Sequence, residues 1–528
     1  MSSYSELSNL PIREIPGDYG FPIISAIKDR YDYFYNQGED AWFHNKAEKY
    51  KSTVVKINMA PGPFTSNDYK LVAFLDANSF VCMFDNSLID KTDTLGGTFK
   101  PGKEYYGGYR PVAFIDTKDP NHAALKGYIL SAFAKRHNLF IPLFRNSLSD
   151  HLFNNLEKQV TEQGKSDFNA LLPTMTFNFI FRLLCDQTNP SDTVLGAQGP
   201  EHLRKWLFPQ LIPSLSAKKL PNIIEDTLFH NFLIPFGFIK SDYNKLVDAF
   251  SKSAVSILDE AENLGIKREE AVQNILFLVG INMFAGLNAF FPHLFRFVGE
   301  AGASLHTQLA KEIRTVIKEE AVQNILFLVG INMFAGLNAF FPHLFRFVGE
   351  AGASLHTQLA KEIRTVIKEE GGAITLSAIN KMSLVKSVVY ETLRLRPPVP
   401  LQYGKAKKDF MVQSHDASYK INKGQFVVGY QPMASRDPKI FANPDEFVPD
   451  RFMNDGEKML KHVLWSNGRE TENPAPDNKQ CPGKDLVHLL GRLILVEFFM
   501  RYDTFTVEIT PLFRAPNVAF KTLTKASK

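Results

Sequence analysis

The run Asn478-Lys479-Gln480-Cys481-Pro482-Gly483-Lys484 is followed at once by an apolar, helix-like stretch over residues 485–499. A cysteine in a tight loop that leads into a helix N-terminus lies where the helix dipole favours a thiolate, which can be a nucleophile, a redox group or a metal ligand. Gly483 has no side chain, so a flat macrocycle could approach its backbone closely. Cys481 is therefore a candidate ligand for haem iron, although a structural cysteine is the simpler interpretation of this run taken alone.

The composition bounds the class of protein. The chain has 528 residues, 45% of them apolar, and 45 phenylalanines, which suits a large aromatic core. Its formal charge of +4 is spread without a basic block, so nothing predicts binding to nucleic acid. The three cysteines, Cys82, Cys185 and Cys481, are too few for a disulfide framework and favour a reducing compartment.

No targeting or anchoring segment is evident. Residues 1–40 contain neither an apolar signal region nor an Arg/Ser-rich presequence, so we expect no plastid transit peptide and a cytoplasmic location. The stretch 275–291 is apolar but contains two asparagines and ends at Pro292, so it predicts a buried helix rather than a transmembrane anchor. Residues 206–239 are rich in Pro, Leu, Ile and Phe and could make peripheral contact with a membrane; ordinary packed loops explain them equally well.

A 50-residue segment occurs twice. Residues 269–318 recur without a change as 319–368. Solenoid repeats are degenerate and need several copies, so two perfect copies indicate a very recent duplication or an error in the gene model. Each copy predicts an apolar helix, a break at proline and an amphipathic helix. A helix that is apolar on all sides needs one enclosed slot, and we therefore expect one copy to be displaced. Removing either copy gives the same 478-residue sequence, because 528 − 50 = 478.

The remaining pattern predicts one domain over residues 1–528. Residues 41–115 carry short apolar runs, at 53–57, 71–75 and 80–84, between Gly/Pro turns, as a small sheet would. Helix-period stretches dominate residues 120–395, and a second strand region spans about 400–450. The predicted class is mainly α with a smaller β region.

Three charged residues form a spaced set upstream of Cys481. Glu391 and Arg394 stand at i and i+3 on one predicted helical face, with apolar neighbours that indicate a buried pair. A buried ion pair needs further partners, and Arg451 in Pro449-Asp450-Arg451-Phe452 is a candidate third member. The order is the pair, then Arg451, then Cys481.

With this order and spacing the chain resembles the haem-thiolate cytochrome P-450 superfamily over essentially its whole length apart from one repeat copy. The resemblance implies a cytochrome P-450 haem-thiolate fold, haem b with Cys481 as the iron ligand, and a bracing triad of Glu391, Arg394 and Arg451. It also implies that the helical turn of His122 and Lys126 meets a haem propionate; a solvated helix face is an almost equal alternative.

The departures from that superfamily are informative. Its mono-oxygenases carry an acid–alcohol pair above the haem, whereas this chain has Asn288-Ala289 or Asn338-Ala339 at the corresponding place. Neither pair can relay protons in the same way. No Rossmann or flavin fingerprint is present, so no reductase is fused to the chain.

An insertion ahead of Cys481, containing Glu470-Thr471-Glu472-Asn473-Pro474, resembles the plant branch of allene oxide synthases, hydroperoxide lyases and divinyl ether synthases. That resemblance implies a polyunsaturated fatty acid hydroperoxide as substrate, with neither dioxygen nor NADPH required and no reductase partner. Asn282, or Asn332 in the second copy, falls where the family has an asparagine that points at the hydroperoxide.

The choice within the branch depends on weaker features. Allene oxide synthases resemble one another in having a Phe at the position that Leu95 occupies in this chain. Simple packing within its loop is the alternative role for Leu95. The run Gly280-Ile281-Asn282-Met283-Phe284 and the N-terminal residues 10–17 look most like 9-divinyl ether synthases of the nightshade family, which make colneleic and colnelenic acids. Allene oxide synthase, hydroperoxide lyase, an NADPH-dependent mono-oxygenase and a non-catalytic haem or lipid carrier remain as alternatives.

Overall fold

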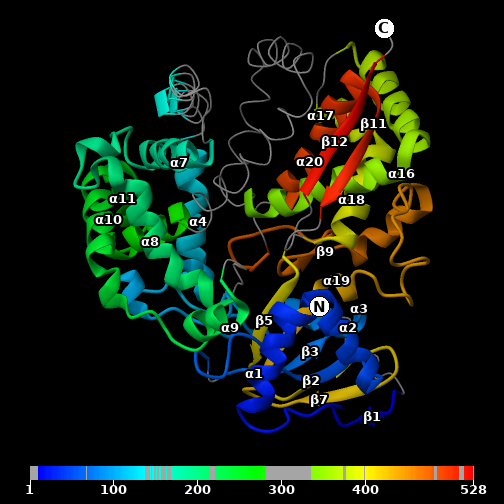
Figure 1. Ribbon diagram of the computed structural model, residues 1–528, viewed down its shortest axis with the longest axis horizontal. Helices are drawn as coiled ribbons and strands as arrows, with labels where there is room; N and C mark the ends of the chain where they lie inside the picture. Colours follow the sequence, from blue (N-terminus) through cyan, green and yellow to red (C-terminus); the bar gives the residue numbers. More distant parts are fainter. Residues whose placement is uncertain are drawn as a thin grey trace.

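The computed structural model describes residues 10–66, 68–136, 168–214, 220–280, 334–372, 376–397, 399–480, 484–510 and 517–526, with further single residues between 139 and 162. Within these ranges helices dominate, and the strands form one five-stranded sheet and three smaller ones (Figure 1). The predicted mainly α class with a smaller β region is confirmed.

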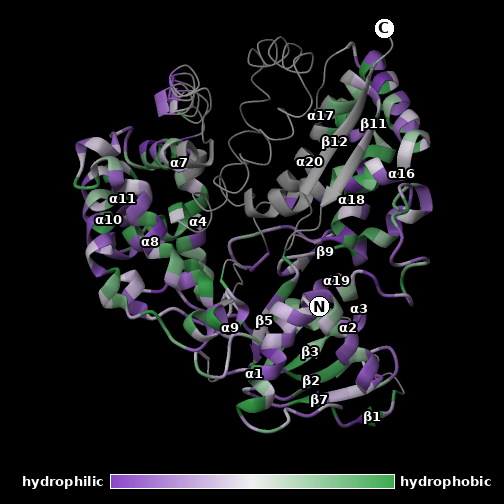
Figure 2. Cartoon of the chain, in the orientation of Figure 1, coloured by the Kyte–Doolittle hydropathy of each residue, from purple (hydrophilic) through white to green (hydrophobic). Residues whose placement is uncertain are grey.

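The five-stranded sheet joins two distant parts of the chain. Its order is β2 (Val54–Asn58), β3 (Lys70–Phe74), β8 (Phe426–Tyr430), β5 (Leu401–Ala406) and β4 (Ile89–Asp90). β3 and β8 are parallel and the other neighbours antiparallel. Trp42 and Phe43 of α2 (Glu39–Tyr50) pack into the same apolar cluster as β2 and β3, whose apolar residues appear green in Figure 2. The two strand regions expected from the sequence therefore form one sheet.

The smaller sheets lie around this one and at the C-terminus. They consist of β1 (Ile12–Arg13), β7 (Ser418–Ile421) and β6 (Phe410–Gln413); of β9 (Leu464–Trp465) and β10 (Gly468–Arg469); and of β11 (Tyr502–Thr510) and β12 (Asn517–Lys525). The last pair lies beside the C-terminal helices (Figure 1).

The helices form two groups. The group on the left of Figure 1 contains α4 (His122–Ala134), α7 (Phe168–Leu184), α8 (Gly199–Leu211), α10 (Lys240–Ser253) and α11 (Val255–Asn263), and α12 (Arg268–Phe277) packs against it. The other group contains α16 (Phe334–Glu369), α17 (Leu376–Asn380), α18 (Ser383–Leu395) and α20 (Lys484–Arg501). One apolar core cluster runs through both groups. No described helix has the length and apolar character needed to cross a membrane.

One predicted strand is wrong. Residues 80–84 are helical, because α3 (Ala77–Phe80) is followed directly by the 3₁₀ turn η2 (Val81–Phe84). The Asp76 carboxylate caps this segment by accepting the backbone N–H groups of Asn78 and Ser79 at 2.9 and 2.8 Å. A capped helix N-terminus is a local signal that outweighed the short apolar run.

The described residues use parts of both repeat copies. α12 and the residues up to 280 come from the first copy, and α16 comes from the second. Position 334 of the second copy corresponds to 334 − 50 = 284 of the first, so the two pieces together equal one copy without residues 281–283. Both pieces are built into the core: Ile275 and Leu276 of α12 and Leu359 and Ile363 of α16 are buried.

The break expected at proline does not occur in the described copy. α16 continues through Pro342, and its non-helical residue is Gly352, with φ 74° and ψ −168°. Glycine adopts this positive φ without strain. The helix is therefore interrupted at Gly352 rather than at Pro342, which lacks only an amide hydrogen.

Candidate active site

A cavity of about 270 Å³ lies between α4 and α12 on one side and β5 of the five-stranded sheet on the other. Its apolar wall includes Ile129 of α4, Phe277 of α12 and Leu401 of β5. Its floor includes Asn478, Lys479 and Gln480, the residues that lead to Cys481. The sequence that suggested a ligand loop is therefore continuous with the wall of this cavity.

Four basic groups line the cavity: Lys91, His122, Lys126 and Lys479. None of its described lining residues is an aspartate or glutamate. Lys126 Nζ donates to the carbonyls of Ala475 and Asn478 at 2.7 and 2.8 Å. Lys479 Nζ donates to the carbonyls of Val112 and Ile115 at 3.2 and 3.0 Å.

Burial and mutual repulsion disfavour the charged forms of these groups. Burial, followed by the charges of Lys479 and Lys126, lowers the pKa of His122 to about 4. Burial and the neighbouring Lys126 lower the pKa of Lys479 to about 8. Burial lowers the pKa of Lys91 to about 7, against partial compensation by Cys82 and Asp116. A cavity wall of this kind is suited to an anionic ligand.

The cavity fits the acidic edge of a haem. His122 is 1% exposed, and its Nδ1 has no hydrogen-bond partner among the described residues. The buried Nδ1 of His122 and the ammonium groups of Lys126 and Lys479 together form a set of donors that suits carboxylates. The structure brings His122 and Lys126 to one cavity. Lys479 was missed as a member of this set, although it stands two residues before Cys481.

The insertion ahead of Cys481 connects elements that surround the cavity, although residues 470–474 are not among its lining residues. Glu470 accepts hydrogen bonds from Tyr390 Oη of α18 at 2.8 Å and from Trp465 Nε1 of β9 at 2.6 Å. Farther along the insertion, Ala475 and Asn478 supply the carbonyls that hold Lys126. The insertion thus connects α18, β9 and α4 around the cavity.

Cys481, Asn282 and Asn332 lie outside the described residues. The described residues nearest to Cys481, at the two ends of the loop that would hold the iron ligand, are Gln480 and Lys484. Gln480 is buried, lines the cavity and donates to the Arg469 carbonyl at 2.7 Å. Lys484, the first residue of α20, is buried and donates to the Glu470 carbonyl at 2.7 Å.

Glu391, Arg394 and Arg451 lie together, as their spacing predicted. Arg394 donates to both carboxylate oxygens of Glu391 at 2.7 and 2.8 Å, and Arg451 Nε contacts the same two oxygens at 2.9 and 3.0 Å. Arg394 also donates to the carbonyls of Ser435 and Pro444. A buried carboxylate that satisfies two guanidinium groups holds α18 to the 435–451 segment.

Leu95 lines the cavity and is 52% exposed, so it lies at the mouth. The backbone of its loop is fixed, since Thr94 Oγ1 donates to the Lys91 carbonyl at 3.0 Å and Gly97 lies against the Tyr403 ring. An added Cβ at Gly97 would come within 3.2 Å of that ring, and Gly97 has φ +86°. Glycine therefore fits this position without a close contact to the ring or backbone strain.

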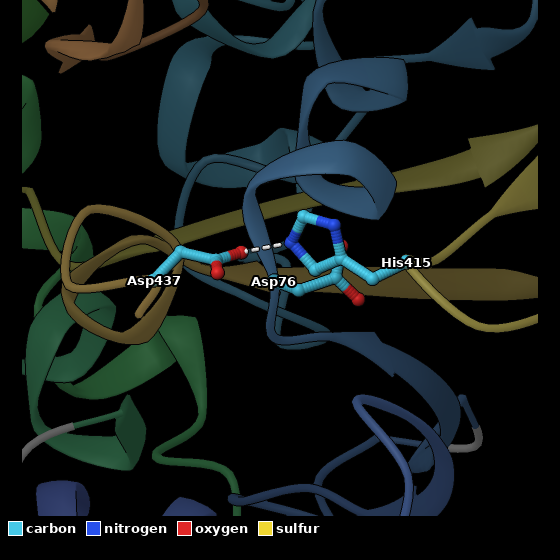
Figure 3. A group of neighbouring side chains, drawn as sticks. All are labelled: Asp76, His415 and Asp437. Atoms are coloured by element: carbon cyan, nitrogen blue, oxygen red, sulfur yellow. Dashed lines mark hydrogen bonds and ion pairs between the residues drawn. The ribbon is translucent and has the colours of Figure 1, made fainter. Parts of the chain in front are cut away.

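A second cluster of metal-ligating residue types lies away from the cavity. Asp76, His415 and Asp437 place their ligand atoms within 4.8 Å of one another (Figure 3). His415 Nε2 bonds to Asp437 at 2.6 Å, Asp437 accepts the Ala77 N–H at 2.8 Å, and Asp76 caps α3. These polar atoms are satisfied within the protein, and the cluster ties α3 to the β6–β7 turn and to residue 437.

Comparisons with known proteins agree with this geometry. The cytochrome P450 family model matches residues 354–510. The solved structure "Retinoic acid bound cyanobacterial CYP120A1" aligns with a TM-score of 0.53 at 16% identity, over 97% of this chain and 100% of the other. The fold is therefore that of a cytochrome P450, the class whose haem is ligated by a cysteine thiolate.

Sequence relatives are much nearer. The chain is 90% identical over 528 residues to "Divinyl ether synthase CYP74D2" of Solanum tuberosum, with 100% of both chains covered. It is 83% identical to "9-divinyl ether synthase" of Capsicum annuum, over 100% of both chains. "Allene oxide synthase 3" of Solanum lycopersicum is 46% identical, over 99% of this chain and 96% of the relative. The chain belongs to the divinyl ether synthase family of cytochromes P450.

Proposed function

We propose that the protein is a haem-thiolate lyase that dehydrates 9-hydroperoxides of linoleic and linolenic acid to divinyl ethers, colneleic and colnelenic acids, without dioxygen or NADPH. The observation that carries the proposal is the difference in sequence identity between two groups of relatives. Relatives named as divinyl ether synthases are 80–90% identical over the full chain, and those named as allene oxide synthases 42–46%. The missing acid–alcohol pair agrees with a substrate that brings its own O–O bond.

The cofactor of this proposal is haem b, with Cys481 as its iron ligand. When bound, a thiolate-ligated haem supplies cleavage of the O–O bond. Lys126, Lys479 and His122 would hold its propionates, because they offer donors on one side of the cavity where no described acid competes. Glu391, Arg394 and Arg451 would keep the 435–451 segment in place beside the ligand loop.

The substrate side of the cavity has two assigned residues. Asn282, or Asn332 if the second copy occupies that place, orients the hydroperoxide, because an amide can both donate and accept a hydrogen bond. Leu95 limits the cavity at its mouth, where it is half exposed. The whole chain acts as one haem-thiolate domain whose described core uses the equivalent of one repeat copy, drawn from both copies.

The experiment is an anaerobic incubation of the haem-loaded protein with pure 9-hydroperoxide, without reductase or NADPH, followed by mass spectrometry of the products. We expect divinyl ether from the 9-hydroperoxide and much less from the 13-hydroperoxide. Allene oxide hydrolysis products or chain-cleaved aldehydes would assign the chain to the other activities of the branch. Intact hydroperoxide in the presence of a haem Soret band would instead indicate a carrier.

A matched variant tests the ligand. Cys481→Ala should abolish the thiolate signature in the carbon monoxide difference spectrum and all turnover. Cys82→Ala serves as the control, because Cys82 is buried in the sheet cluster away from the ligand loop. An unchanged spectrum in Cys481→Ala would refute the assignment of the iron ligand.

We also propose that the enzyme is cytoplasmic and contacts membranes peripherally. Large apolar side chains are exposed on the segment before and within α1 (Ile24–Tyr31), on α9 (Asn222–Glu225) and η9 (Asp226–His230), and directly after η9. They include Phe21 at 70%, Ile24 at 63%, Ile223 at 70% and Phe232 at 64%. Exposed apolar groups on neighbouring short elements are typical of a surface that enters the lipid interface.

A further inference from the structure

A second cavity, of about 220 Å³, lies between α3 and η2 on one side and the end of η12 (Asn454–His462) with the β9–β10 hairpin on the other. It shares no described lining residue with the first cavity. No aspartate or glutamate is among its described lining residues. Part of its wall is apolar and the rest is polar and basic: Ala77, Val81 and Leu464, and Asn78, Lys461, His462 and Arg469.

The hairpin places Arg469 on this cavity and the ligand loop on its other side. Leu464 and Arg469 are directly opposite each other in the antiparallel pair, so their side chains lie on the same face of the hairpin. Gly468 belongs to the opposite face, because successive strand residues alternate. There an added Cβ at Gly468 would come within 2.7 Å of the Gln480 side chain. The hairpin therefore lies between the second cavity and the residue before the candidate iron ligand.

The three basic side chains of the second cavity have neither an ion-pair nor a hydrogen-bond partner among the described residues. Arg469 is the costly case, because its Nε is buried without an acceptor. Its backbone, by contrast, is fixed: the N–H donates to Glu472 Oε2 at 2.9 Å, and the carbonyl accepts from Gln480 Nε2 at 2.7 Å. A charged side chain with unused donors is thus held at the cavity.

The described acid that acts on this group does not neutralise it. Asp437 influences His462, but its carboxylate already accepts two backbone N–H groups and the ring of His415 (Figure 3). Burial, followed by the charges of Lys461 and Arg469, lowers the pKa of His462 against the weaker effect of Asp437. The cations therefore dominate the local field, and the cavity is suited to an anion.

The donors and the apolar wall together indicate the chemistry of the ligand. A guanidinium offers parallel N–H groups that match the two oxygens of a carboxylate, and an ammonium adds a second positive charge. The cavity of about 220 Å³ exceeds several times the roughly 30 Å³ that a water molecule occupies. It therefore has room for an apolar chain, which Val81 and Leu464 can contact.

We propose that this cavity binds a carboxylate that carries a short aliphatic chain, with Arg469 and Lys461 as the donors to the carboxylate and with Val81 and Leu464 against the chain. The inference goes beyond the proposed function, because it concerns a separate cavity on the other face of the hairpin. A ligand that binds only the folded chain stabilises it, so occupancy should raise the unfolding temperature of the haem-loaded protein.

The test is isothermal titration calorimetry of hexanoate into the haem-loaded full chain without substrate. We expect saturable binding, and a Kd about tenfold higher in both Arg469→Met and Lys461→Met, because each loses a charged donor. If Arg469→Met does not fold, Lys461→Met decides, since Lys461 is exposed. Lys458→Met is the matched control and should bind as the wild type, because Lys458 is 80% exposed on the same η12, pairs with Asp455 and does not line the cavity.

Two further probes separate the charge from the chain. Hexanoate should bind more tightly than inorganic phosphate or 1-hexanol; equal or tighter binding of phosphate would overturn the role of the apolar wall, and equal binding of hexanol that of the cations. Absence of saturable binding would overturn the proposal. So would unchanged binding in both variants with a shift of the haem Soret band, which would locate hexanoate in the first cavity. No turnover is measured, so these outcomes are independent of the proposed activity.

Discussion

At the residue scale, the carboxylate of Glu391 forms ion pairs with two guanidinium groups. Its side chain is fully buried and is shared by Arg394, also fully buried, and by Arg451, 9% exposed. Removing one partner from a buried ion pair costs about 3–5 kcal/mol, because the remaining charges stay desolvated. We expect Glu391→Gln to lower the free energy of unfolding by about this amount in urea titrations followed by circular dichroism.

The control for Glu391 is Glu457→Gln. Glu457 pairs with Lys386 at 2.9 Å but is 54% exposed, so its loss should change stability by about 0.5 kcal/mol or less. Equal unfolding midpoints for the two variants would contradict a bracing role for the triad.

Residues differ in how well the sequence reveals them. The Glu391–Arg394 pair follows from helix spacing, which is local, and Arg451 follows from the need of a buried pair for a partner. Lys91 carries no local mark: its burial arises because β5 from residues 401–406 packs beside it. The cationic character of the cavity depends on pairing between distant segments, which no local pattern encodes.

At the element scale, α1 and η9 are joined by a buried arginine. Arg30 Nε and Nη2 donate to the Asp226 carboxylate at 2.9 and 2.6 Å, and Nη1 donates to the carbonyls of Pro61, Gly62 and His230. This clamp fixes the positions of α1 and η9 relative to each other. The exposed side chains Phe21, Ile24, Ile223 and Phe232 are thereby presented on a fixed support.

Substitution of these elements tests the membrane contact. Burial of a large apolar side chain contributes about 1.5–3 kcal/mol, so Ile223→Glu with Phe232→Glu should weaken binding to phosphatidylcholine vesicles at least tenfold, measured by co-sedimentation. Val255→Glu is the control, because Val255 is 45% exposed but lies at the start of α11. Equal sedimentation of the double variant and the wild type would exclude this surface.

At the scale of the whole molecule, the question is which copy of the duplicated segment supplies each part of the core. The core takes residues up to 280 from one copy and from 334 onward from the other, which together equal one copy less three residues. Two identical copies offer the fold two equal sources for each piece. Sequence alone predicted that only one copy's worth could be accommodated, but it could not show that both copies would contribute.

Removal of 50 residues between the two pieces is therefore the decisive experiment. Deletion of 281–330 gives the same 478-residue chain as deletion of either copy, since the copies are identical. Closing a connection of about 50 residues costs about 3 kcal/mol of chain entropy, so the shortened chain should unfold at higher urea concentration, bind less of a dye for exposed apolar surface, and retain at least wild-type haem content and product formation. If the 478-residue chain were instead the less stable or the inactive form, both copies would have to be structural parts of the protein.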